Sequence, residues 1–111
     1  MQNGILKLAD TDSEAASVLL DGALTVRTIA NVRDVLLAAL TDHQVVRVDC
    51  RAADAVDLSG IQILLAAHRS ASAAGKQLVL AAPADGTLRS ALEQGGFLDA
   101  AGGNPFWSGD T

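Results

Sequence analysis

The sequence predicts an α/β domain with the element order β-β-α-β-α-β-α, in which helices cover mainly one face of a four-stranded mixed sheet. Short apolar runs typical of strands alternate with longer segments in which apolar residues recur at helical spacing. Strands that alternate with helices are typical of parallel neighbours joined by right-handed crossovers. In the strand predicted at residues 45–50, apolar side chains occupy alternate positions, so one face of the sheet is expected to be buried.

The first two strands are expected to form an antiparallel hairpin. Residues 5–8 are predicted to form a short strand, and residues 17–21 a second strand that Gly22 ends. The polar stretch 10–13 between them has the composition of a turn. Because the two strands are close in the sequence and joined by a turn, antiparallel pairing is expected.

An amphipathic helix of about 12 to 15 residues follows, because apolar residues recur at helical spacing from Ile29 to Leu40. Thr25 and Thr28 are alternative N-caps for this helix. The strand at 45–50 comes next, and its residues are expected to alternate between the two faces of the sheet. One face would carry Val46, Val48 and Cys50, and the other Val45, Arg47 and Asp49.

The second half of the chain repeats the alternation of helix and strand. Apolar spacing predicts a second helix from Ile61 to about Ala74. Residues 78–82 are apolar and predict a fourth strand. A third helix follows, for which Asp85 and Thr87 are alternative caps.

The chain has 111 residues, which is enough for one domain with a single core. We expect this domain to span residues 1–100. A Gly-rich tail, residues 101–111, follows it. The tail is expected to be loose, except that Phe106 and Trp107 are candidates for docking on the core.

Composition argues against several classes of partner and location. The net charge of −5 does not suit a nucleic-acid backbone, and two phenylalanines and one tryptophan offer little for base stacking. No apolar run is long enough to span a membrane, and the N-terminus lacks the features of an export signal. The single cysteine, Cys50, cannot form an internal disulfide. We therefore expect a cytoplasmic protein that does not insert into a membrane.

Ser59 stands where a loop gives way to the second helix. Unpaired backbone N–H groups and the positive end of the helix dipole gather at such a position, so an added anion would be tolerated there. Capping the helix is the commonest role of a serine before a helix. Helix capping and phosphorylation therefore both remain open for Ser59 on local grounds.

The residues around Ser59 do not match either of two enzyme classes. A serine hydrolase would need Gly-x-Ser-x-Gly, but Asp57 and Ile61 replace the two glycines, and His68 lies too far along the same helix to reach Ser59. A phospho-accepting receiver domain would use Asp49 at a strand end. It would also need an acid pair and a lysine beside that aspartate, and Lys76 is expected at the opposite end of its strand.

No metal or cofactor site is predicted. Asp49, Asp54 and Asp57 cluster in the sequence, but no His or Cys spacing supports a transition metal. No Gly-rich nucleotide-binding motif is present. Cys50 is expected to be a small buried residue, and His68 a partly buried polar one. The sequence therefore favours a protein that binds and is acted upon over a catalyst.

Four motifs, in order, resemble those of the STAS domain, the family of anti-sigma-factor antagonists and related modules. Residues 22–25 (GALT) resemble the glycine-containing turn before the first helix, and residues 45–49 (VVRVD) resemble the V-V-x-V-D strand. Residues 55–61 (AVDLSGI) resemble x-x-D-S-S-G-L, and residues 92–97 (LEQGGF) resemble the closing helix and turn. The resemblance covers about residues 4–100 and implies a STAS-like fold.

In the antagonist branch, the serine just before the glycine is phosphorylated by a partner kinase that is also the anti-sigma factor. That serine is Ser59 here, whereas Leu58 replaces the family's other serine. The resemblance implies a kinase partner, an anti-sigma factor or a chemotaxis-type kinase, and a PP2C-type phosphatase as a further partner. The expected contact residues are Asp54, Asp57, Leu58, Ser59, Gly60 and Gln62, with Gly22, Thr25 and Thr28 from the earlier loop.

Two branches of the family resemble this chain in different degrees. Residues 57–64 together with 22–25 look closer to stand-alone STAS proteins associated with bacterial chemotaxis-type signalling clusters. They resemble more loosely the STAS subunit of a phospholipid-transport ABC complex. The main expectation is therefore a non-catalytic switch controlled through Ser59, and the alternative is a constitutive subunit of such a transporter.

Overall fold

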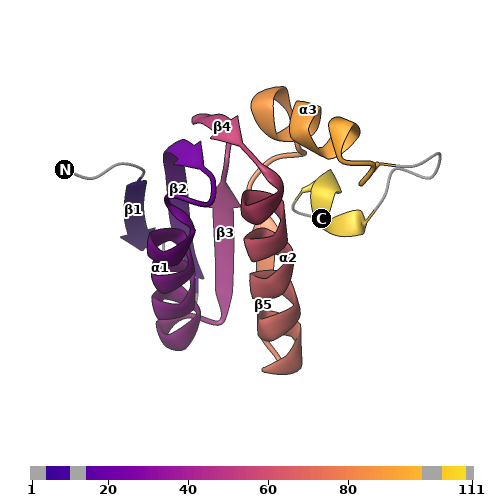
Figure 1. The fold of residues 1–111 in the computed structure, drawn as a ribbon. Helices are drawn as coiled ribbons and strands as arrows, with labels where there is room; N and C mark the ends of the chain where they lie inside the picture. Colours follow the sequence, from indigo (N-terminus) through magenta and orange to yellow (C-terminus); the bar gives the residue numbers. More distant parts are fainter. Residues whose placement is uncertain (1–4, 11–14, 99–103, 110–111) are drawn as a thin grey trace.

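The computed structural model describes residues 5–10, 15–98 and 104–109 of the chain. The predicted order of strands and helices is confirmed, with one strand and one short helix added (Figure 1). The elements are β1 (Ile5–Asp10), β2 (Ala15–Leu24), α1 (Ile29–Asp42), β3 (Val45–Asp49), β4 (Ala53–Val56), α2 (Leu58–Ala73), β5 (Gln77–Leu80), α3 (Gly86–Gln94) and the 3-10 helix η1 (Pro105–Ser108).

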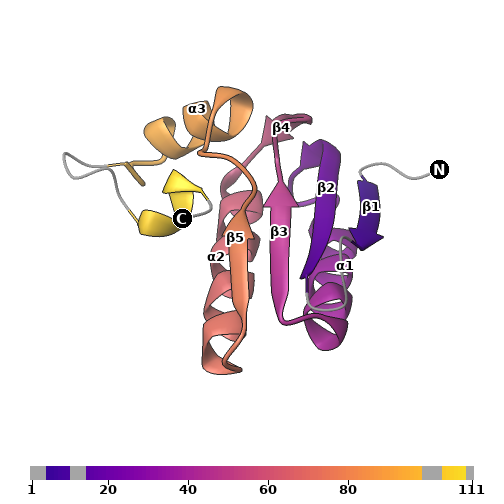
Figure 2. The same ribbon diagram turned by 180° about the vertical axis from the view of Figure 1, so that it is seen from behind.

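The sheet has the strand order β1-β2-β3-β5, with β4 paired to the end of β2 (Figure 2). β1 and β2 are antiparallel, as the hairpin prediction requires. All the other pairings, β2 with β3, β3 with β5 and β2 with β4, are parallel. The predicted turn at 10–13 lies almost wholly outside the described residues.

The two long helices cover one face of the sheet. α1 and α2 lie in front of the strands in Figure 1, and the opposite view in Figure 2 has the strands in front. Side-chain burial agrees, because Val46, Val48 and Cys50 are at most 8% exposed whereas the alternate residues of β3 are half-buried. α3 lies beyond the end of the sheet toward which β3 and β5 point (Figure 2).

Two expectations for the β2 and β4 region were wrong. Gly22 does not end the second strand; β2 continues to Leu24, and its register with β4 shifts at Gly22, whose φ is 94°. Glycine adopts this conformation without steric penalty, so the strand passes through the irregularity. β4 was missed because its sequence, ADAV, has little strand propensity, and its strand form depends on pairing with β2.

The C-terminal segment 104–109 is packed rather than loose, and the expected docking is confirmed. Phe106 and Trp107 are 5% and 3% exposed and belong to the main hydrophobic core. The carbonyl oxygen of Trp107 accepts a hydrogen bond from the amide of Ala84, at 2.9 Å. No helix in the described ranges has the length and apolar character needed to cross a bilayer.

Candidate functional site

The candidate site lies where the loop after β2 meets the first turn of α2. Parallel pairing of β2 with β4 places Leu24 opposite Val56. The amide of Asp57 then donates a hydrogen bond to the carbonyl oxygen of Leu24, at 3.2 Å. The unpredicted strand β4 is therefore the element that brings the loop at 25–28 beside the helix start.

Asp57, rather than Ser59, is the N-cap of α2. One oxygen of its carboxylate accepts a hydrogen bond from the amide of Gly60, at 3.1 Å. The other accepts a hydrogen bond from the amide of Val26, also at 3.1 Å. A single side chain thus caps the helix and joins it to the preceding loop. The interpretation of Ser59 as the helix cap was therefore wrong.

Gly60 permits the close approach of the helix to the strand. A Cβ atom at this position would lie 2.3 Å from the carbonyl oxygen of Leu24 and 2.9 Å from its Cγ. Such distances are shorter than van der Waals contact, so any side chain would push α2 away from β2. The glycine after Ser59 is required by packing and fixes where Ser59 stands.

Ser59 lies in the first turn of α2 and is half-buried. Its hydroxyl makes no hydrogen bond with the described part of the chain, and neither do the amide N–H groups of Leu58 and Ser59. Such unpaired N–H groups at a helix start are the donors that favour an anion. The hydroxyl is therefore unengaged beside two free donors.

The predicted contact residues of the earlier loop play different structural parts. Thr28 occupies the N-cap position of α1 but makes no capping bond, and it is only 7% exposed. Its hydroxyl accepts a hydrogen bond from the amide of Thr25 and donates one to the carbonyl oxygen of Ala23, at 3.1 and 2.9 Å. Thr28 therefore stabilises the loop through its buried hydroxyl. Thr25 is half-buried, and Gly22 lies where the register between β2 and β4 shifts.

Several apolar and polar side chains are exposed around the site. Asp54 and Gln62, both predicted contact residues, are exposed, and Leu58 is 54% exposed. Val26, which the sequence did not single out, is 65% exposed. Only the hydrogen bond from its amide to Asp57 reveals that Val26 belongs to this site.

The residues considered for catalysis lie elsewhere or are engaged. His68 faces the carbonyl oxygen of Leu78 through Nδ1, at 3.0 Å, and its ring lies 4.8 Å from that of Phe106. Among the described residues, no group of three or more His, Cys, Asp or Glu side chains is arranged to hold a metal ion. Neither result adds a catalytic group to Ser59.

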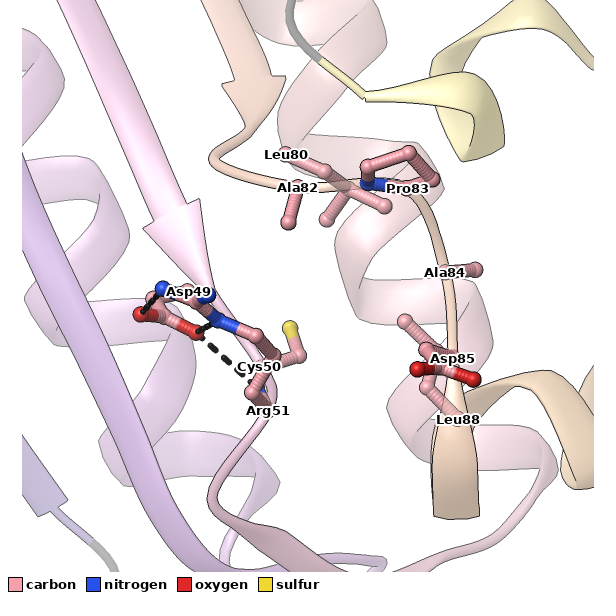
Figure 3. Close-up of a pocket in the computed structure, with 9 residues that line it drawn as sticks. All are labelled: Asp49, Cys50, Arg51, Leu80, Ala82, Pro83, Ala84, Asp85 and Leu88. Carbon is pink, nitrogen blue, oxygen red and sulfur yellow. Dashed lines mark hydrogen bonds and ion pairs between the residues drawn. The ribbon is translucent and has the colours of Figure 1, made fainter.

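Asp49 and Cys50 line a small pocket at the ends of β3 and β5 (Figure 3). Arg51 donates two side-chain hydrogen bonds to Asp49, at 3.0 and 2.8 Å, and these bonds lower the pKa of that carboxyl. Burial, followed by the charge of Asp49, raises the pKa of the Cys50 thiol to about 12. The pocket volume is about 10 Å³, which is roughly the space of one water molecule.

Comparison with solved structures identifies the same fold in signalling and transport proteins. An anti-sigma factor antagonist from Mycobacterium paratuberculosis has 17% sequence identity and a TM-score of 0.71, over 85% of this chain and 79% of that one. Phosphorylated SpoIIAA from Bacillus has 18% identity and a TM-score of 0.64, over 83% and 84%. A sulfate transporter family protein from Wolinella succinogenes has 23% identity and a TM-score of 0.59, over 79% and 71%.

Sequence comparison identifies the family to which this chain belongs. No curated protein gives a significant match. A family model described as "Mlab, STAS domain" matches residues 8–99, which include every strand and helix from β2 to α3. With this match and the shared fold of anti-sigma factor antagonists, the chain belongs to the STAS domain family.

Proposed function

We propose that this protein is a non-catalytic interaction switch of the anti-sigma-factor antagonist type, controlled by phosphorylation of Ser59 by a partner kinase. The observation that supports it best is the Ser59 hydroxyl, which lies in the first turn of α2, within the family's motif, and makes no hydrogen bond to any residue that the structure describes. SpoIIAA, which shares the fold, has been solved in unphosphorylated and phosphorylated forms. The proposal places the protein in the bacterial cytoplasm, where the kinase has ATP.

A phosphate on Ser59 would perturb the fold little. It adds roughly −1.5 to −2 charges at neutral pH. The unpaired amides of Leu58 and Ser59 and the helix dipole offset part of this charge, with a stabilisation of about 0.3–1 kcal/mol from the dipole. Both carboxylate oxygens of Asp57 are bonded to backbone amides, so the conformation of the helix start does not depend on the Ser59 hydroxyl.

The effect of the phosphate would fall on the partner interface. The proposed contact surface includes the exposed side chains of Asp54, Leu58 and Gln62, which surround Ser59 in sequence. A phosphate buried in this interface without a cationic group opposite it would lose its hydration, which costs free energy. It would also add negative charge beside acidic residues. A penalty of ~2.7 kcal/mol lowers the affinity about a hundredfold.

The experiment is quantitative co-purification from the native cells with tagged wild-type, Ser59→Ala and Ser59→Asp proteins, with and without added ATP. The switch predicts that one kinase is retained by wild-type and Ser59→Ala protein and reduced at least about tenfold with Ser59→Asp. Ser70→Asp is the matched control, because Ser70 is exposed on the same helix away from its N-terminus. Equal retention of the kinase by Ser59→Asp and wild-type protein would contradict the switch.

A constitutive STAS subunit of an ABC-type phospholipid transport complex is the second candidate. It is favoured by the structural likeness to a sulfate transporter family protein, which associates this fold with transport. In that case an ATPase would be retained equally by wild-type, Ser59→Ala and Ser59→Asp proteins. Retention would also be independent of added ATP, so the same experiment separates the two candidates.

A further inference from the structure

Residues 104–109, which we name the C-terminal cover, lie beside β5 on the side away from β3 (Figure 2). The carbonyl oxygen of Trp107 accepts a hydrogen bond from the amide of Ala84, just beyond the end of the strand. Gly109 packs against the same stretch, because a Cβ atom at this position would lie 2.7 Å from the backbone nitrogen of Pro83. The cover is therefore attached to the segment that continues β5.

The outer edge of β5 carries backbone groups that are buried but only partly paired. Gln77 and Ala81 donate their amides toward β3, so Leu78 and Leu80, at the alternate positions, turn their N–H and C=O groups outward. The carbonyl oxygen of Leu78 faces Nδ1 of His68, at 3.0 Å. Outside the ladder with β3, the backbone of Leu80 makes no hydrogen bond with any described residue, although Leu80 is only 1% exposed.

The C-terminal cover shields this edge with side chains rather than with backbone pairs. The ring of Phe106 lies 4.8 Å from that of His68, which itself faces the start of β5. No backbone hydrogen bond joins residues 104–109 to β5 itself. A strand aligned on the same edge would supply the missing partners, and buried backbone groups without partners cost free energy. The edge is therefore a strand-pairing site that the cover hides.

We propose that the outer edge of β5 is a pairing surface for β5 of a second copy of this chain, and that the C-terminal cover blocks this pairing in the monomer. Charge favours an antiparallel pair of copies. β5 has no charged residue, Lys76 directly precedes it, and Asp85 follows it after a short loop. Antiparallel strands related by a twofold axis bring the Lys76 end of each copy toward the Asp85 end of the other. The pairing does not depend on the phosphorylation of Ser59.

The first test uses the wild-type protein and native-state hydrogen exchange measured by NMR at increasing urea concentration. The proposal requires the cover to open while the core stays folded. The amide of Ala84 should therefore exchange through a local opening with little dependence on urea, and faster than the amide of Leu64, which is buried in α2. Exchange at Ala84 with the rate and urea dependence of Leu64 would overturn the proposal, because the edge would then be exposed only by global unfolding.

The second test detaches the cover in the full chain through Gly109→Ala. The control is Gly96→Ala: both glycines have positive φ, 91° and 78°, but a Cβ atom at Gly96 would meet no atom within 4 Å. We expect Gly109→Ala to shift the emission of Trp107, the single tryptophan, to longer wavelength. It should also double the molar mass measured by light scattering after gel filtration. Wild-type and Gly96→Ala proteins should remain monomers at the same concentration.

A further substitution distinguishes edge pairing from association through exposed aromatic rings. Val79 is half-buried in β5, at the position between the two buried leucines, and is aligned with Arg47 of β3. Val79→Glu should restore the monomer in the Gly109→Ala protein, because antiparallel pairing would bring the two glutamates together. Dimers of the wild type, a monomeric Gly109→Ala protein, unchanged Trp107 emission in that protein, or association that persists with Val79→Glu would each overturn the proposal.

Discussion

The carboxylate of Asp57 accepts a hydrogen bond from the amide of Val26, 31 residues earlier in the chain, at 3.1 Å. Its second oxygen caps α2 through the amide of Gly60. The loop after β2 and the helix start that carries Ser59 are thus held by one side chain. A substitution at Asp57 should therefore affect both segments, although α1, β3 and β4 separate them in the chain.

Asp57→Ala should lower the free energy of unfolding by about 1–2 kcal/mol, because it removes the helix cap and the bond to the loop. Urea unfolding followed by circular dichroism measures this change. Asp54→Ala is the control, since the Asp54 side chain is exposed and makes no hydrogen bond or ion pair with the described residues; its effect should stay within about 0.5 kcal/mol. Equal effects of the two substitutions would contradict the role assigned to Asp57.

Gly60→Ala should destabilise the protein by about 1–3 kcal/mol, because the new Cβ would lie 2.3 Å from the carbonyl oxygen of Leu24. Ser59→Ala, one residue earlier, should change the stability by less than about 0.5 kcal/mol, since the hydroxyl does not cap the helix. Thermal unfolding of both variants checks this contrast. A loss of stability at Ser59 as large as that at Gly60 would show that the hydroxyl has a structural role.

Trp107→Ala should cost about 3–5 kcal/mol, because this side chain is 3% exposed and belongs to the main core. Ser108→Ala is the control, as Ser108 is the exposed neighbour in η1. Urea unfolding followed by circular dichroism suits both variants, since Trp107 is the only tryptophan. An effect of Trp107→Ala below about 1 kcal/mol would mean that the C-terminal segment is dispensable to the core.

Cys50 should resist alkylation in the folded protein. Burial raises the pKa of its thiol from 9.0 to about 12, and the side chain is 8% exposed. Iodoacetamide at about pH 8 should therefore label the native protein far more slowly than the protein in urea. As this is the only cysteine, intact mass reports the reaction directly. Equal labelling rates in the two states would contradict the burial of Cys50.

The same shift gives a pH dependence of known sign. Below pH 9.0 both the folded and the unfolded thiol keep their proton, so Cys50 adds no pH dependence. Between 9.0 and about 12 the unfolded thiol ionises while the folded one does not. The free energy of unfolding should therefore fall as the pH rises through this range, and Cys50→Ala should remove that part of the fall. A fall that is identical in wild type and Cys50→Ala would contradict the raised pKa.

Strong periodic patterns made most of the fold predictable. The alternation at 45–50 gave both the strand and its buried face, and the burial of Val46 and Val48 confirms it. Asp85, one of two candidate caps, is the residue that caps α3. β4 was not predictable, because residues 53–56 become a strand only through pairing with β2. This tertiary contact produces no periodic pattern of apolar residues in the sequence.

The candidate site was predictable in position but not in its internal roles. The motif located Ser59 at the start of α2, yet the helix begins at Leu58, so Asp57 takes the capping position. The first residue of a helix depends on individual hydrogen bonds and can differ by one or two positions. Composition therefore does not identify which residue caps the helix. Val26 could not be found from the sequence, since its membership of the site depends on the long-range bond to Asp57.

The most direct test of the central claim is peptide mass spectrometry of the protein purified from its native cells with phosphatase inhibitors present. The switch predicts a substantial fraction of molecules with one phosphate, located on Ser59 and absent from the Ser59→Ala protein. The exposed serines of α2, such as Ser70, should be unmodified. Absence of phosphate from Ser59 under several growth conditions would contradict the switch and favour a constitutive subunit.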